Sequence, residues 1–320
     1  MPTQGCGGLS GARILVRMAN PLLLLPDFLL IVLGFVICRR TALDRPVWEA
    51  AEKLVYFLLF PVLLFSSIVK SPLQFGPAAS LAAAGVGTTA IGIVVALAIG
   101  RWPGVDRRLH ASGAQTAYRF NSYIALALSE RLYGAPGLAC MALLIALSVP
   151  LCNVAAVWPL ARHGGHSYLR EIARNPLIIS TVLGLVANAA GLVLPEVLAT
   201  VLQRIGIAAL PLGLMAVGAG LTFGGLRAAP RLATALLGIR HALLPMVAIG
   251  LALTVHLAPE QRDVVVLFGA LPTSAASYVL ATRMGGDGSF VAGLVTVSTL
   301  LGMLSIPLWL AVVAALATTP

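Results

Sequence analysis

Ten long runs of apolar residues follow one another along this chain, separated by short stretches that carry charges and turn residues. A bilayer has a hydrocarbon core of about 30 Å, which a helix of roughly 20 apolar residues crosses. The pattern therefore predicts an all-α integral membrane protein with about ten transmembrane helices. The expected spans are 21–39, 47–69, 77–100, 108–132, 136–160, 175–194, 197–221, 232–257, 262–284 and 288–316.

Composition agrees with lipid as the solvent. Of the 320 residues, 59% are hydrophobic and 10% are charged, whereas soluble proteins carry about 25% charged residues. The net charge of +10 does not indicate a nucleic-acid partner, because Lys and Arg are scattered along the whole chain. The four cysteines are widely spaced without a CxxC pair, so we expect neither a disulfide framework, nor a metal site, nor a cofactor.

The distribution of positive charge predicts the orientation. Of the 21 Lys and Arg, 12 lie at loops that follow odd-numbered spans, 5 lie on the opposite side, and the remaining 4 fall within spans. Cytoplasmic loops of membrane proteins are enriched in Lys and Arg. We therefore expect a multi-pass protein of a bacterial-type plasma membrane with both termini outside, and we assign no function to the N-terminal tail, residues 1–20.

The two halves of the chain resemble each other in three places. Residues 147–151 and 304–308 read LSVPL and LSIPL, at an offset of 157. Ser122-Tyr123 matches Ser277-Tyr278 at an offset of 155, and Pro61 matches Pro211 at an offset of 150. Three matches at similar offsets indicate an internal repeat.

A repeat of five helices has an odd number of crossings, so its second copy enters the membrane from the opposite side. We expect a first repeat at 21–160, a cytoplasmic loop at 161–174, and an inverted second repeat at 175–316. Inverted repeats of this kind are common in secondary transporters.

The fourth span contains a polar cluster around Arg119. This residue lies twelve positions after Arg107, and at 1.5 Å per residue this places it about 18 Å into the membrane. An arginine at the bilayer centre costs at least about 2.5 kcal/mol and needs a partner or a water-filled cavity. The charge of Arg119 could be balanced by a bound ligand. The alternative is a structural partner within the protein, such as a carboxylate or the carbonyl groups of a helix end.

The ninth span contains a matching cluster behind Pro272. This proline removes a backbone donor and is expected to break the helix. The N-termini of half-helices carry unpaired N–H groups and a positive dipole, which favour anions. Two breaks that cross near Arg119 would form a site for a carboxylate, although the hydroxyls could instead hold the helices together.

From these clusters we predict that Arg119 pairs with a substrate carboxylate and that tyrosines line the cavity. No catalytic residue is predicted. The predicted substrate-binding residues are Arg119, Asn121, Ser122, Tyr123, Thr273, Ser274, Ser277 and Tyr278. The predicted hinges or helix breaks are Pro61, Pro211 and Pro272, of which the first two could also be kinks that only shape packing.

Three segments resemble the auxin efflux carrier family. Residues 54–65 (LVYFLLFPVLLF) are similar to its second helix, 119–124 (RFNSYI) to its fourth and 271–274 (LPTS) to its ninth. The resemblance implies a fold like that of the bile acid:sodium symporters, with broken helices four and nine that cross at their midpoints. It also implies an elevator-like cycle of two bundles and a homodimer. One departure is Phe120, where many bacterial members have Gly.

The residues and the resemblance together predict a secondary active transporter of a small organic anion, with a carboxylate as the substrate class. Coupling to protons and coupling to sodium both stay open, because no acidic cluster matches the sodium sites of the bile acid branch. The alternatives are a membrane-embedded sensor that uses the same pocket without transport, and a sodium-coupled symporter. A membrane-embedded enzyme is disfavoured because no acid/base pair is evident.

Overall fold

The computed structural model describes residues 25–70, 75–160, 176–222 and 225–316, and the regular elements within these ranges are helices. The predicted tail, residues 1–20, and the predicted loop at 161–174 lie outside the described residues. Six described stretches are long and apolar enough to cross a membrane, so the chain is a multi-pass membrane protein. These stretches are Arg45–Lys70, Ala78–Arg101, Arg107–Ala156, Glu196–Ala219, Pro230–Thr254 and Gly288–Leu316. The count of ten spans and the inverted repeat stay predictions.

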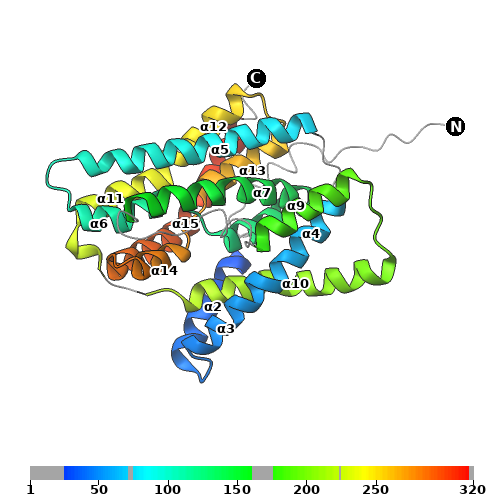
Figure 1. Ribbon diagram of the computed structural model, residues 1–320, viewed down its shortest axis with the longest axis horizontal. Coiled ribbons are helices and arrows are strands. Elements are labelled where there is room, and N and C mark those ends of the chain that lie inside the picture. The colour runs from blue at the N-terminus through cyan, green and yellow to red at the C-terminus, as the bar shows by residue number, and fades with distance from the viewer. Residues whose placement is uncertain (1–24, 71–74, 161–175, 223–224, 317–320) are drawn as a thin grey trace.

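One group of helices, which we call the small bundle, lies in the lower part of Figure 1. Helix α2 packs against α10, while α4 packs against both α9 and α10. The members are α2 (Leu25–Arg40), α3 (Arg45–Leu54), the π-helical turn η2 (Val55–Leu59), α4 (Phe60–Lys70), α9 (Pro176–Ala189) and α10 (Glu196–Ala219).

Glycine brings the backbones of α2 and α10 into contact. A methyl group on Gly34 would overlap the carbonyl oxygen of Met215, and one on Gly218 would overlap that of Ile31. Any larger residue at either position would push the two helices apart. Small residues are the usual means of close helix packing in membranes, where hydrophobicity alone does not drive helices together.

The other helices form the large bundle, in the upper and left parts of Figure 1. In it, α13 packs against α5, α7, α12 and α15, and α5 also packs against α7 and α12. The α-helices are α5 (Phe75–Ala98), α6 (Arg107–Gly113), α7 (Ser122–Leu160), α11 (Pro230–Gly238), α12 (Leu244–Thr254), α13 (Pro259–Ala270), α14 (Ala276–Arg283) and α15 (Gly288–Leu316). The short turns are η3 (Ile99–Arg101), η4 (Ala114–Ala117), η5 (Leu226–Ala228) and the π-helical η6 (Ile239–Leu243).

Helix α7 joins the two bundles. It is kinked at Gly134, whose φ of 63° is readily adopted only by glycine, and this kink separates the predicted fourth and fifth spans. The helix contacts α4, α9 and α10 of the small bundle. Tyr123 of α7 stacks on Phe60 of α4 with ring centroids 5.0 Å apart, and Arg131 forms an ion pair with Asp27 of α2 at 3.2 Å.

The prolines inside the helices act differently from one another. Helix α10 continues through Pro211 without interruption, so this predicted hinge or break is not a break in the structure. Pro61 lies within α4, two residues after the wide π turn η2, and Pro245 lies two residues after η6. A proline ring clashes with the carbonyl four residues earlier, and a wider turn relieves that clash.

Candidate functional site

Two irregular segments interrupt the large bundle where the sequence predicts helix breaks. Residues 118–121 separate η4 from α7, and residues 271–275 separate α13 from α14. The two segments are in direct contact, because the backbone N–H of Asn121 donates to the carbonyl oxygen of Pro272 at 2.9 Å. We call residues 118–121 and 271–275 together the junction.

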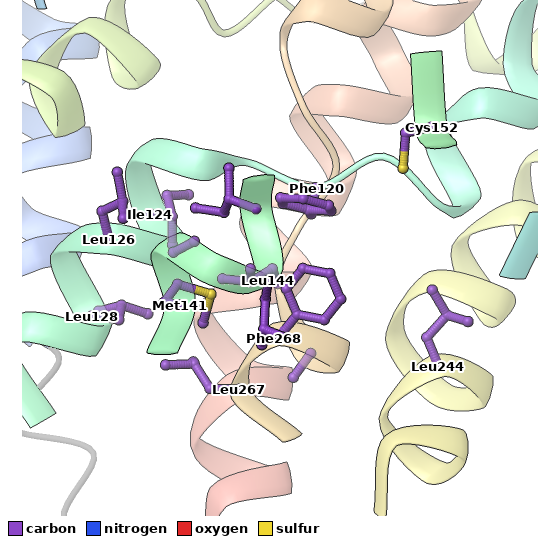
Figure 2. Packing of buried hydrophobic residues seen from close by; sticks show 14 of the residues in the cluster. Phe120, Ile124, Leu126, Leu128, Met141, Leu144, Cys152, Leu244, Leu267 and Phe268 are labelled. Carbon is purple, nitrogen blue, oxygen red and sulfur yellow. The ribbon is translucent and has the colours of Figure 1, made fainter. Parts of the chain in front are cut away.

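Apolar packing fixes the position of the junction. The ring of Phe120 is 4% exposed and packs edge to face on Phe268, with centroids 4.6 Å apart (Figure 2). On the ninth-span side, a methyl group on Gly302 of α15 would lie 3.3 Å from Pro272, so α15 packs closely against that proline. Phe120 is therefore a core residue that holds the first broken segment against the end of α13.

Side chains from the junction cap the half-helices that begin there. The Oδ1 atom of Asn121 accepts hydrogen bonds from the N–H groups of Tyr123 at 3.0 Å and Ile124 at 3.3 Å. The Oγ atom of Ser274 accepts from the N–H of Ala276 at 3.3 Å. Both are neutral N-caps, so the positive ends of the two helix dipoles are not compensated by a charge from the capping side chain.

Gln115 links the two sides of the junction. Its Oε1 atom accepts from the guanidinium of Arg119 at 3.4 Å, and its Nε2 atom donates to the carbonyl oxygen of Ser277 at 3.2 Å. The sequence analysis did not select Gln115. Its position four residues before Arg119, which would be the same face of the predicted fourth span, is the signal that could have found it.

The predicted binding residues fall into two groups by exposure. Arg119, Ser122, Tyr123 and Ser274 are partly exposed, and Tyr278 is 44% exposed.

Thr273 and Ser277 are 0% exposed, and Asn121 is also buried. Within the part of the chain that the structure describes, the Oγ1 atom of Thr273 and the Oγ atom of Ser277 have no hydrogen-bond partner. A buried hydroxyl without a partner costs about 1–3 kcal/mol, so these two oxygen atoms are available to a ligand or a water molecule.

A second arginine, Arg240, lies against the junction. It is not among the predicted binding residues. It lies in η6, at the middle of the α11–α12 helix, and is 2% exposed. Its Nη2 atom donates to the carbonyl oxygens of Gly269 at 2.5 Å and Phe268 at 3.2 Å, and Nη1 to that of Tyr118 at 3.5 Å. These carbonyls belong to the end of α13 and to the first broken segment. The signal that could have found Arg240 is an arginine inside the apolar run 232–257.

His241 extends the polar network from the junction to α15. Its Nε2 atom lies 2.8 Å from the Oγ atom of Ser298, and its Nδ1 atom lies 2.9 Å from that of Ser305. The Oγ atom of Ser298 also accepts from the backbone N–H of Thr273 at 3.0 Å. His241 lies in the middle of the helix formed by α11, η6 and α12. Within the described ranges, no group of three or more His, Cys, Asp or Glu side chains is placed to hold a metal ion.

Comparison with known proteins identifies the class of molecule that carries this site. The profile of a family described as "Membrane transport protein" matches residues 159–310, which include Arg240 and the ninth-span break.

Two relatives are named as transporters. A protein of Methanothermobacter thermautotrophicus, named "Uncharacterized transporter", is 30% identical over 146 residues, which is 45% of this chain and 48% of that protein. A protein of Rhizobium meliloti, named "Putative malonate transporter", is 24% identical over 304 residues, which is 89% of this chain and 92% of that protein. The match thus spans about half the length of the first relative and nearly all of the second.

Proposed function

We propose that this chain, which resembles the auxin efflux carrier family and matches the profile of membrane transport proteins over residues 159–310, is a secondary active transporter of a small organic anion. The substrate class is a carboxylate, and the binding site is the junction. The name of the Rhizobium meliloti relative agrees with this class, since malonate is a dicarboxylate.

The electrostatics of the junction is the observation that supports an anionic substrate best. Two half-helices begin there, and each helix N-terminus carries about half a positive elementary charge. Their caps, Asn121 and Ser274, are neutral. Arg119 adds a full positive charge at the first break and is partly exposed. An anion at this place is favoured by both dipoles and by the guanidinium.

The side chains of the junction and of the first turns of α7 and α14 take different roles in this proposal. Arg119 pairs with the substrate carboxylate, and Ser122 hydrogen-bonds it. The hydroxyls of Thr273 and Ser277, which lack protein partners among the described residues, donate to the substrate once it is bound. Asn121 and Ser274 act mainly by holding the helix ends in place, while Tyr123 and Tyr278 line the cavity.

Alternating access follows from movement of the large bundle, which carries the junction, against the small bundle. The contacts of α7 with α4, α9 and α10 form the sliding surface. Pro61 and its π turn, on α4 at this surface, would act as a hinge.

Counterflow in proteoliposomes tests the proposal. Vesicles that contain the purified protein and unlabelled malonate should accumulate external radiolabelled malonate, while protein-free vesicles should not. Arg119→Gln should lower the initial rate at least about tenfold, because it removes the charge that pairs with the carboxylate. The matched control is Arg204→Gln, which removes an exposed arginine of α10 and should leave the rate unchanged.

Two results would contradict the proposal in different ways. An unchanged rate in Arg119→Gln would exclude the role assigned to Arg119. Binding of carboxylates to the purified protein, measured by thermal shift, without counterflow of any of them would identify the sensor alternative.

A further inference from the structure

The guanidinium of Arg240 lies where the C-terminal ends of two broken helices meet. Its three hydrogen bonds go to backbone carbonyl oxygens: those of Phe268 and Gly269 near the end of α13, and that of Tyr118 directly after η4. Pro272 explains why the Phe268 carbonyl needs such a donor. In a continuous helix that oxygen would accept from the N–H four residues later, and a proline at this position has none.

Among the described residues, Arg240 forms no ion pair with a carboxylate, and the ends of the two helices can balance its charge. Each helix C-terminus carries about half a negative elementary charge, so two ends together supply roughly the charge that one guanidinium neutralises. A buried charge is tolerated only when it is paired and hydrogen-bonded. Half-helix C-termini and unwound carbonyls are also the groups that bind alkali cations in broken-helix transporters. Arg240 therefore occupies a position whose ligands suit a metal cation.

The turn that carries Arg240 is itself fixed to α15. The carbonyl oxygen of His241 loses its usual donor because Pro245 follows four residues later, and the indole Nε1 of Trp309 donates to it instead at 2.8 Å. The imidazole of His241 contacts Ser298 and Ser305 of the same helix. The contacts of His241 with α15 thus fix the backbone beside Arg240, while the three carbonyl oxygens fix its guanidinium.

We propose that Arg240 is a positioning residue that acts as a resident cation. It takes the place of a bound metal ion at the ends of the two broken helices. This goes beyond the proposed function, because it concerns how the two broken segments are held together and not which substrate is transported. Arg240 does not contact the substrate. It keeps the two broken segments together, and its positive charge is the property that matters.

Thermal unfolding of the purified protein in sodium chloride and in choline chloride tests the cation position without any substrate. The midpoint of the wild-type protein should be the same in both salts. Arg240→Ala removes the side chain and leaves the three carbonyls, so sodium should raise its midpoint above that in choline, as a ligand of the folded state does. Arg240→Met fills the space without a charge and should not respond to sodium.

Substrate uptake provides the second readout, and it keeps the proposal testable if Arg240→Ala does not fold. Arg240→Lys retains the charge and should keep the KM for malonate within about twofold while the maximal rate falls. Arg240→Met should lower the rate at least about tenfold. Arg204→Met, on exposed α10, is the matched control.

The proposal is overturned if sodium stabilises the wild-type protein as much as Arg240→Ala, or if Arg240→Ala folds and ignores sodium. It is also overturned if Arg240→Met transports as fast as Arg240→Lys. Failure of the proposed function is a separate result. If the wild-type protein does not transport malonate, sodium can still stabilise Arg240→Ala and leave the wild-type protein unaffected, and the cation position would then stand without the transport function.

Discussion

Two side chains at the junction that were predicted to bind substrate also cap the helices that begin there. Asn121 and Ser274 were predicted to bind substrate, and the structure shows that their oxygen atoms accept hydrogen bonds from the first N–H groups of α7 and α14. The polar residues in the middle of an apolar span are therefore required by the helix break itself. Because these caps are neutral, the helix ends still attract an anion.

Exchange of the cap at residue 121 should separate stability from substrate binding. Asn121→Ala removes both cap hydrogen bonds and should cost about 1 kcal/mol of stability. Asn121→Asp keeps the acceptor atoms and should retain stability, but its negative charge repels an anionic substrate. We expect the KM for malonate to rise at least about tenfold in Asn121→Asp. Uptake rates give the KM, and the midpoint of thermal unfolding, measured for the same variants, gives the stability.

The matched control uses the N-cap of α6, where the side chain of Asp106 accepts from the N–H of Leu109 at 2.8 Å. Asp106→Asn should change neither stability nor KM appreciably. A normal KM in Asn121→Asp would mean that the substrate charge does not lie near this helix end.

Among the helices, the π turn η6 is the element that brings several functional groups together. The wide turn precedes Pro245 and places Arg240 at the junction and His241 against α15. A π turn inside an α-helix is often found at a functional position. The related turn η2 precedes Pro61 in the small bundle, so a π turn followed by a proline occurs on both sides of the proposed sliding surface.

A double substitution tests the account of η6. Trp309→Phe removes the indole donor and leaves the carbonyl of His241 without a partner, which should lower the free energy of unfolding by about 1–3 kcal/mol. Pro245→Ala provides an N–H four residues after His241, so the double variant should recover part of this loss. The coupling is obtained from a double-mutant cycle of unfolding midpoints. Strictly additive effects would show that Trp309 does not substitute for the missing helical donor.

The helices that the structure describes form two bundles, which meet along α7. The ion pair between Arg131 of α7 and Asp27 of α2 crosses from one bundle to the other. If the bundles slide past each other during transport, this pair must break in each cycle. A covalent link at this place should stop the cycle, whereas a link within one helix should not.

Cross-linking tests this motion. In a cysteine-free background, Asp27→Cys with Arg131→Cys should lose nearly all malonate counterflow after treatment with a short bifunctional thiol reagent that a reductant can cleave. Reduction should restore the rate. The control pair is Arg45→Cys with Glu49→Cys, which replaces an ion pair of 3.4 Å within α3. Full activity of the linked Asp27–Arg131 variant would exclude relative motion at this contact.

Local signals in the sequence were sufficient for the class of fold and for the places of the two breaks. Lipid requires apolar runs and satisfied backbone groups, so the membrane helices are visible as hydropathy. A proline or a polar cluster inside such a run stands out for the same reason. Pro272 predicted the break at 271–275, whereas the break at 118–121 was implied by the family resemblance, and the polar cluster around Arg119 marked its place. By contrast, Pro211 gives the same signal, yet α10 continues through it without a break.

Only the tertiary structure decided which charged group lies against the broken helix ends. Arg240 is about 120 positions from the first break and about 30 from the second, and hydropathy does not report which helices are neighbours or how each is rotated. Contacts between distant helices bring its guanidinium to Tyr118 and Gly269. They also turn the ring of Phe120 into the core, against Phe268. Composition and periodicity determine that helices form and where they break, while packing determines what each buried polar group meets.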